Sequence, residues 1–216
     1  PIVLHPHELA KHRLVLGLAS WFAQHGDRVH DVRYGVLAPA LMIGLPVTAT
    51  ILQPNFGGAL LLVTFGAVLI FLAGARAGHL LVSAAFAIPV LLTIGLSASY
   101  RVDRVAVFWD PFVEPLDRGY QLVQSLFAFG KGGVFGVGLG ASQQKWSFLP
   151  EAHTDFILAI IGEELGLIGV GAVLIAFAVL GIASLGIASR SRDLHGQLIA
   201  AGAGMLLWLQ AAINAG

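Results

Sequence analysis

The fold of this 216-residue chain is decided by an uncharged stretch at residues 34–75, which reads YGVLAPALMIGLPVTATILQPNFGGALLLVTFGAVLIFLAGA. These 42 residues contain no Asp, Glu, Lys or Arg. About 20 apolar residues suffice for one helix to cross a bilayer. Gln53-Pro54-Asn55 divides the stretch, because proline interrupts helices and asparagine favours turns. The stretch therefore predicts two membrane-spanning helices, at Val36–Leu52 and Phe56–Ala73.

Four further segments extend this pattern along the chain. Ala77–Tyr100 and Leu165–Ser189 are uncharged runs of 24 and 25 residues, and each is long enough for one crossing. Leu194–Gly216 carries a single titratable side chain, His195. Glu8–Gln24 is apolar on average but contains several charged residues. We therefore expect an all-α, polytopic transmembrane helix bundle of about six crossings.

The composition supports this class and excludes others. The chain is 57% hydrophobic and 11% charged, whereas soluble domains are about 25% charged. Its 12 basic and 12 acidic side chains balance, so nothing favours a nucleic-acid surface. Cysteine is absent, which excludes disulfides, thiolate zinc sites and a cysteine nucleophile in this sequence. We interpret residues 1–216 as a single membrane domain from the middle of a longer protein.

The arginines of the short loops predict the orientation. Loops 25–35, 74–78 and 190–195 fall on one side and carry arginine, whereas the 53–55 turn opposite carries no basic residue. The positive-inside rule places the arginine-bearing side in the cytoplasm. The long loop 101–153 is then extracytoplasmic.

Glycine is frequent in this long loop, and Gly136-Val137-Gly138-Leu139-Gly140-Ala141 imitates a dinucleotide-binding fingerprint. That fingerprint requires a preceding strand inside a βαβ unit. We expect instead a glycine-rich re-entrant or surface loop between membrane spans.

Asp155 is the strongest candidate for a catalytic group. Thr154 or Asp155 opens the helix after Pro150, where an Asp or Thr side chain commonly caps the free N–H groups. A carboxylate at this membrane boundary could also take a proton from a hydroxyl, and the two roles are compatible. His153 could tune or position the carboxylate, or it could be a solvated loop histidine.

Two acidic residues, Glu163 and Glu164, follow in the same helix. Charge at that depth costs at least about 2.5 kcal/mol, so such residues are either functional or held by a structural hydrogen bond or ion pair. The two side chains lie about 100° apart around a helix, and we expect that they cannot both face one partner. Gly162 and Gly166 would let a neighbouring element approach closely.

Other charged residues offer weaker candidates. Glu8 and Lys11 share one helix face and either line a polar cavity or neutralise each other during insertion. His7 and His12 are five residues apart, which does not place two metal ligands on one face. Basic residues of the long loop could hold a diphosphate, or could simply anchor the chain at the interface. They are Arg101, Arg104, Arg118, Lys131 and Lys145.

Several ordered motifs closely resemble the SEDS family (shape, elongation, division and sporulation), whose members polymerise bacterial cell wall. The motifs are Pro6–Lys11, Gln53–Gly57, Arg118–Leu126, Gly136–Ser142, Gln144-Lys145, Pro150–Ile157 and Gly162–Gly166. Their spelling is more similar to the cell-division branch of the family than to its elongation branch. His7, His12, Arg13, Asn55 and Gly58 depart from the usual family residues.

The resemblance implies a ten-helix membrane fold, of which this chain would supply roughly the fourth to ninth crossings. It implies a peptidoglycan glycosyltransferase acting on lipid II, an undecaprenyl-diphosphate-linked disaccharide-pentapeptide, in the bacterial inner membrane at the division septum. It implies as partners a class B penicillin-binding protein and other divisome membrane proteins, with no nucleic acid.

The resemblance also assigns residues. The essential acid of the family maps to Asp155, and its Glu…Lys pair maps to Glu8 and Lys11. Lys145, His153, Arg101, Arg118, Lys131 and Gln53 complete the expected substrate-binding set. A divalent cation, Mg²⁺ or Mn²⁺, is an alternative to basic side chains for stabilising the diphosphate. A lipid II flippase and a non-catalytic divisome scaffold remain alternative functions.

Overall fold

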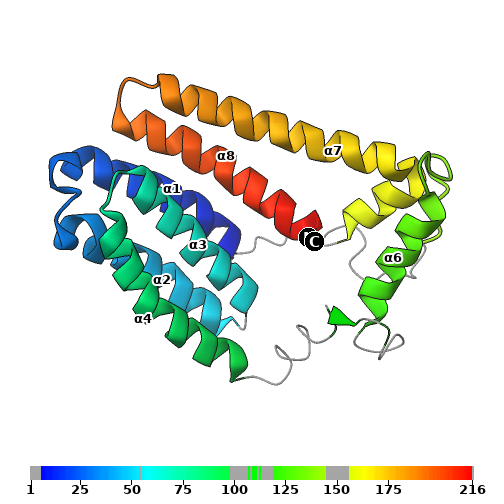
Figure 1. Ribbon diagram of the computed structural model, residues 1–216, viewed down its shortest axis with the longest axis horizontal. Helices are drawn as coiled ribbons and strands as arrows, with labels where there is room; N and C mark the ends of the chain where they lie inside the picture. The colour runs from blue at the N-terminus through cyan, green and yellow to red at the C-terminus, as the bar shows by residue number, and fades with distance from the viewer. Residues whose placement is uncertain are drawn as a thin grey trace. The chain divides into compact units, whose positions relative to one another are not determined.

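The computed structural model describes residues 6–53, 55–97, 107, 109–110, 112, 119–144 and 156–215. Within these ranges the regular structure is helical and contains no strand, which confirms the all-α class. The elements in chain order are α1 (Pro6–His25), η1 (Gly26–Arg28), η2 (Arg33–Leu37), α2 (Ala38–Leu52), α3 (Phe56–Leu72), α4 (Ala77–Leu96), α6 (Tyr120–Gly132), α7 (Ile157–Arg190) and α8 (Leu194–Ala215) (Figure 1).

Helices occupy all six segments that the sequence predicts as crossings. Three helical segments of the described chain are long and apolar enough to span a membrane, namely Arg33–Leu52, Ala77–Leu96 and Ile157–Arg190. The apolar helix α3 is shorter, at 17 residues. α1 and α8 form at the predicted positions but are less apolar, so the count of six crossings stays a prediction.

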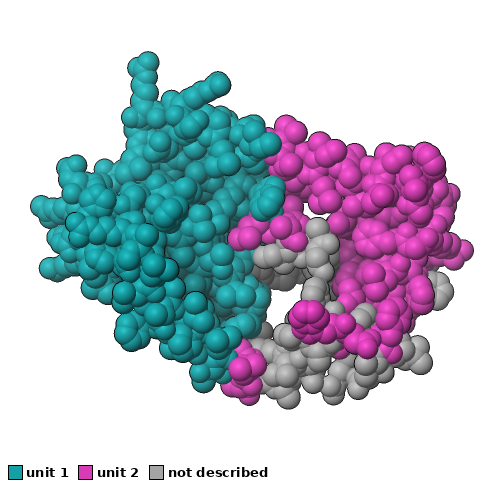
Figure 2. Space-filling view, viewed as in Figure 1, with its two compact units in different colours: residues 1–93, 180–208 teal, residues 94–179, 209–216 magenta. Residues whose placement is uncertain are grey.

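The chain divides into two compact units (Figure 2). Unit 1 comprises residues 1–93 and 180–208, and unit 2 comprises residues 94–179 and 209–216. Long helices pass from one unit to the other, since α7 and α8 each contribute residues to both.

The core of unit 1 forms where α1, α2, α3 and α8 pack together (Figure 1). Leu18 and Phe22 of α1, four residues apart and so on one helix face, are fully buried with Leu62 and Phe65 of α3. Leu41 and Leu45 of α2 have most of their surface exposed. Apolar side chains buried inward and exposed outward are typical of a helix bundle whose solvent is lipid.

The turn before α3 is held by a side-chain cap. The Gly58 N–H donates to Oδ1 of Asn55 at 2.8 Å, which satisfies one of the free donors at the start of the helix. The sequence predicts a turn at Gln53-Pro54-Asn55, and the cap shows that the amide oxygen of Asn55 stabilises the start of α3 there.

Asp193 directly precedes α8, and its side chain caps this helix as Asn55 caps α3. This cap gives a testable pH dependence. The Gly196 N–H donates to Asp193 Oδ2 at 2.8 Å, and this hydrogen bond holds the pKa of the exposed carboxyl below its ordinary value. A lowered folded pKa means that the stabilisation is present above the unfolded pKa and is lost as the pH falls through the folded one.

We therefore expect Asp193→Asn to make thermal stability less sensitive to acid. Asparagine still caps a helix, so the melting temperature at neutral pH should change little. The drop in melting temperature between neutral pH and about pH 3 should be smaller in the variant than in the parent protein. An equal drop in both proteins would contradict this role for Asp193.

Unit 2 contains a helix, α6, within the range 101–153 that the sequence predicts as a long loop. α6 lies inside this range and buries one face, with Val123 and Ala128 almost without exposed surface. Ala128 packs against Ala159 and Ile160 of α7. The range is therefore partly helical, and the side of the membrane on which it lies stays a prediction.

α7 is interrupted at Gly166, whose backbone adopts φ 67° and ψ −165°. Such a positive φ is accessible to glycine at little cost and breaks the helical hydrogen-bond ladder. The predicted span from Leu165 thus begins at the break, and a short helical segment from Ile157 precedes it.

Candidate functional site

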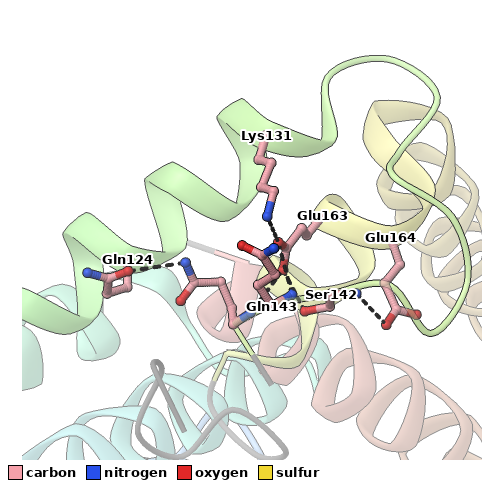
Figure 3. A network of polar contacts seen from close by, with 7 residues as sticks. Gln124, Lys131, Ser142, Gln143, Glu163 and Glu164 are labelled. Carbon is pink, nitrogen blue, oxygen red and sulfur yellow. Dashed lines mark hydrogen bonds and ion pairs between the residues drawn. The ribbon is translucent and has the colours of Figure 1, made fainter. Parts of the chain in front are cut away.

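The polar groups of unit 2 converge on the carboxylate of Glu163, which has no exposed surface (Figure 3). The Ser142 hydroxyl donates to Oε2 at 2.5 Å. The backbone N–H groups of Gln143 and Gln144 donate to Oε1 and Oε2, each at 3.2 Å. The Lys131 ammonium lies 3.4 Å from Oε1. A buried carboxylate is costly unless it is paired and hydrogen-bonded, and this one has four donors.

The break at Gly166 explains why the glycine-rich segment docks here. In an unbroken helix the carbonyls of Glu163 and Glu164 would accept from the N–H groups of Leu167 and Ile168. Here those carbonyls accept instead from Val137 N–H at 2.9 Å and Gly138 N–H at 3.0 Å.

The two donors released by the break are also satisfied by the same segment. Leu167 N–H donates to the Gly133 carbonyl at 2.9 Å, and Ile168 N–H donates to the Val134 carbonyl at 3.3 Å. The segment 133–138 therefore takes up the four backbone groups that an unpaired helix break would leave unsatisfied.

Close approach of the backbones requires glycine on both sides. A Cβ atom on Gly132 would lie 1.9 Å from the Gly162 carbonyl oxygen, and one on Gly136 would lie 2.1 Å from the Glu164 carbonyl oxygen. A Cβ atom on Gly166 would lie 2.4 Å from the Val134 carbonyl oxygen. The predicted close approach at Gly162 and Gly166 is confirmed.

The structure places Gly136–Ala141 in the loop after the helix α6, whereas a dinucleotide-binding fingerprint follows a strand. The element before it is the helix α6, not a strand, and no βαβ unit occurs in the described parts of the chain. Gly136, Gly138 and Gly140 have φ values of 80°, 111° and 80°, so glycine serves the backbone path of a docked loop.

The expectation that Glu163 and Glu164 cannot face one partner is wrong. The Ser142 hydroxyl bonds to Glu163, while the Ser142 N–H donates to Oε1 of Glu164 at 3.3 Å (Figure 3). One residue can serve both because its side chain and its backbone present separate donors. The structural hydrogen bond and ion pair predicted as one alternative for Glu163 both occur, in its contacts with Ser142 and with Lys131 of the neighbouring helix α6.

A second polar contact joins the same loop to α6. Gln144 Nε2 donates to Oε1 of Gln124 at 3.1 Å. Neither Ser142 nor Gln124 is predicted as a contact residue from the sequence. Both lie in motifs that carry the resemblance to the SEDS family, and that position in a motif is the available signal.

The remaining sequence-predicted residues fall in different places. Asp155, Lys145, His153, Arg101 and Arg118 lie outside the described residues, as does the side chain of Glu8. Their proposed roles stay predictions.

Three predicted residues can be placed. Lys11 is buried in α1 with 4% of its surface exposed, and Gln53 is exposed at the end of α2. Both belong to unit 1, whereas Lys131 belongs to unit 2 and pairs with Glu163. Among the described residues, no group of three or more His, Cys, Asp or Glu side chains is arranged to hold a metal ion.

The fold and these motifs define a polytopic helical membrane protein with a glycine-rich loop docked on a broken helix. The sequence profile of the FtsW/RodA/SpoVE family of cell cycle proteins matches residues 1–216. The chain therefore belongs to this family, which is the SEDS family that the motifs indicated.

Curated relatives are similar in sequence to this chain over almost its whole length. It is 39% identical over 212 residues to the probable peptidoglycan glycosyltransferase FtsW of Thioalkalivibrio sulfidiphilus, covering 97% of this chain and 53% of the relative. It is 41% identical over 219 residues to that of Nitrosococcus halophilus, covering 100% and 56%. It is 37% identical over 214 residues to the stage V sporulation protein E of Bacillus subtilis, covering 99% and 58%.

A solved structure shares the fold. A chain from a peptidoglycan synthase complex that coordinates polymerization and crosslinking superposes with a TM-score of 0.72 at 30% identity, covering 100% of this chain and 60% of that one. The chain thus spans a little over half the length of the curated relatives that it matches.

Proposed function

We propose that the protein to which this chain belongs is a peptidoglycan glycosyltransferase that polymerises lipid II into glycan strands during septal cell-wall synthesis. The observation that carries the proposal is the match of the whole chain, at 39–41% identity, to two relatives named as probable glycosyltransferases of this kind. The shared fold with a chain of a peptidoglycan synthase complex supports it.

The proposed reaction joins two lipid-linked glycans. A hydroxyl oxygen of the acceptor sugar forms a bond to the anomeric carbon of the donor, the bond from that carbon to the diphosphate oxygen breaks, and undecaprenyl diphosphate leaves. Asp155 takes the proton of the attacking hydroxyl as a general base. Lys145, Arg101 and Arg118 are the proposed partners of the diphosphate, since cationic side chains stabilise the charge that develops on it.

Described residues of unit 2 hold the part of the chain that directly precedes Lys145. Glu163 and the docked loop hold residues 142–144, which lead directly into Lys145. The possible use of Mg²⁺ or Mn²⁺ stays a prediction.

The proposed setting is the bacterial inner membrane at the septum. Apolar helices long enough to span a bilayer and membership of the family support a membrane protein. The proposed partners are a class B penicillin-binding protein, which would crosslink the strands, and other divisome membrane proteins.

The experiment is reconstitution of the full-length protein and its partner in vesicles with labelled lipid II. Glycan strands resolved by gel electrophoresis are the expected product. Lipid II moved across the bilayer without strand formation would instead make the protein a flippase. A protein that does neither, but still recruits a synthase, would be a scaffold, and either result would overturn the proposal.

A further inference from the structure

We propose that Glu163 is a positioning residue of the polymerisation reaction, acting through the chain segments on either side of residues 145–155. The inference rests on the proposed function, because it concerns the rate of that reaction. The evidence is the set of groups that the Glu163 carboxylate holds (Figure 3).

The carboxylate fixes the chain directly before residue 145. Its two oxygens accept the consecutive backbone N–H groups of Gln143 and Gln144, and Oε2 also accepts the Ser142 hydroxyl. Two adjacent N–H groups held by one rigid carboxylate define the direction of the backbone as well as its position. The backbone of Gln144 is therefore held by a hydrogen bond to the Glu163 side chain of α7.

The chain directly after residue 155 begins the same helix. The Phe156 carbonyl accepts from the Ala159 N–H at 3.0 Å, which starts the first turn of α7. Glu163 lies seven residues further along, about two helical turns. Both ends of the segment 145–155 are thus attached to one short helical piece, and Glu163 makes the attachment at the first end.

The glycine-rich segment before Ser142 is flexible unless side-chain hydrogen bonds hold it. Gly136, Gly138 and Gly140 all have positive φ, and glycine has more backbone freedom than any other residue. The backbone–backbone hydrogen bonds from the docked loop to α7 end at Gly138, four residues before Ser142. Within the described residues, the side chain of Glu163 therefore supplies the last attachment of the loop to α7 before residue 145.

A purely structural need would not require a charge here. Replacing a buried ion pair by apolar residues of similar size is often neutral or stabilising. A carboxylate that binds two successive backbone amides supplies what an apolar side chain cannot, namely a fixed backbone geometry. Reaction rates are sensitive to such geometry, since a displacement of about 1 Å can cost about 100-fold.

The first test uses Glu163→Gln in the full-length protein with its partner. The amide preserves size but removes the charge that pairs with Lys131, and only one of its two polar atoms can accept. We expect kcat for polymerisation to fall about 100-fold while the KM for lipid II is unchanged. Asp110→Asn, an exposed carboxylate elsewhere in the chain, is the matched control and should retain the parent rate.

A second readout does not depend on activity. Residues 1–216 contain no cysteine, so a spin label on Gln143→Cys reports on this loop alone once cysteines elsewhere in the protein are replaced. Glu163→Gln should increase the mobility of that label and leave a label on Gly130→Cys of α6 unchanged. This result is obtained even if the parent protein fails to polymerise lipid II, which would overturn the proposed function alone.

Ser142→Ala provides a variant that keeps the buried ion pair if Glu163→Gln does not fold. It removes only the 2.5 Å hydrogen bond, and we expect a loss in kcat of about tenfold, in line with one hydrogen bond to a charged group. An unchanged kcat in the folded variants, a rise in KM alone, or an unchanged label mobility would each overturn the proposal.

Discussion

Gly132→Leu is expected to prevent unit 2 from folding correctly. A Cβ atom at this position would lie 1.9 Å from the carbonyl oxygen of Gly162 and 2.9 Å from the Cα atom of Glu163. Both neighbours are backbone atoms of α7, so no side-chain rotation can relieve the clash. The strain should cost about 3 kcal/mol, the upper end of the usual range for overpacking. This exceeds the gain of up to about 1 kcal/mol that replacing a helical glycine brings.

The control for this prediction lies two residues away. A Cβ atom on Gly130, in the same helix, meets nothing within 4 Å. Gly130→Leu should therefore melt at the same temperature as the parent protein or slightly higher. Thermal unfolding of the two purified variants in detergent measures the difference, and similar melting temperatures would show that α6 and α7 do not pack as described.

Asp155→Asn is expected to abolish the proposed division function. Asparagine has nearly the same shape as aspartate and can still cap the helix that follows, so folding should be preserved. It cannot accept a proton from the attacking hydroxyl, and loss of a general base costs about 10²–10⁴ in rate. Cells whose only copy carries this variant should grow as undivided filaments although the protein reaches the membrane.

Asp110→Asn is the appropriate comparison in cells too. Asp110 is exposed, and its Oδ1 accepts the N–H of Phe112 in a local turn. Asparagine offers the same acceptor, so cells with this variant should divide normally. Normal division with Asp155→Asn at a matched protein level would exclude the proposed role of Asp155.

The helices that the sequence predicted are those whose signal is local. The uncharged run 34–75 fixed α2 and α3 to within a few residues, because a long stretch without charge has few alternatives to a membrane helix. The turn between them followed from Asn55, which caps α3 as a turn residue should.

α6 was missed because its signal is weak and non-local. It is a 13-residue helix that ends in Gly-Lys-Gly, and it is stabilised by packing of Ala128 against α7. Isolated helices of this length are marginal, so tertiary contacts determine whether they form. Glycine in this region indicated a loop, whereas Gly132 serves close packing of two helices.

The candidate site could be predicted only where its signal is local in the sequence. The depth and charge of Glu163 indicated either function or a structural partner, and the close approach at Gly162 was foreseen from its spacing to Gly166. The partner itself could not be predicted, since Ser142 lies 21 residues away in sequence. It reaches Glu163 only because the break at Gly166 lets segment 133–138 dock.

The rate of lipid II polymerisation by purified full-length protein with its penicillin-binding partner tests the central claim most directly. The parent protein and Asp110→Asn should form glycan strands at equal rates, and Asp155→Asn should form them at less than about one-hundredth of that rate. Strand formation by folded Asp155→Asn at the parent rate would contradict the account.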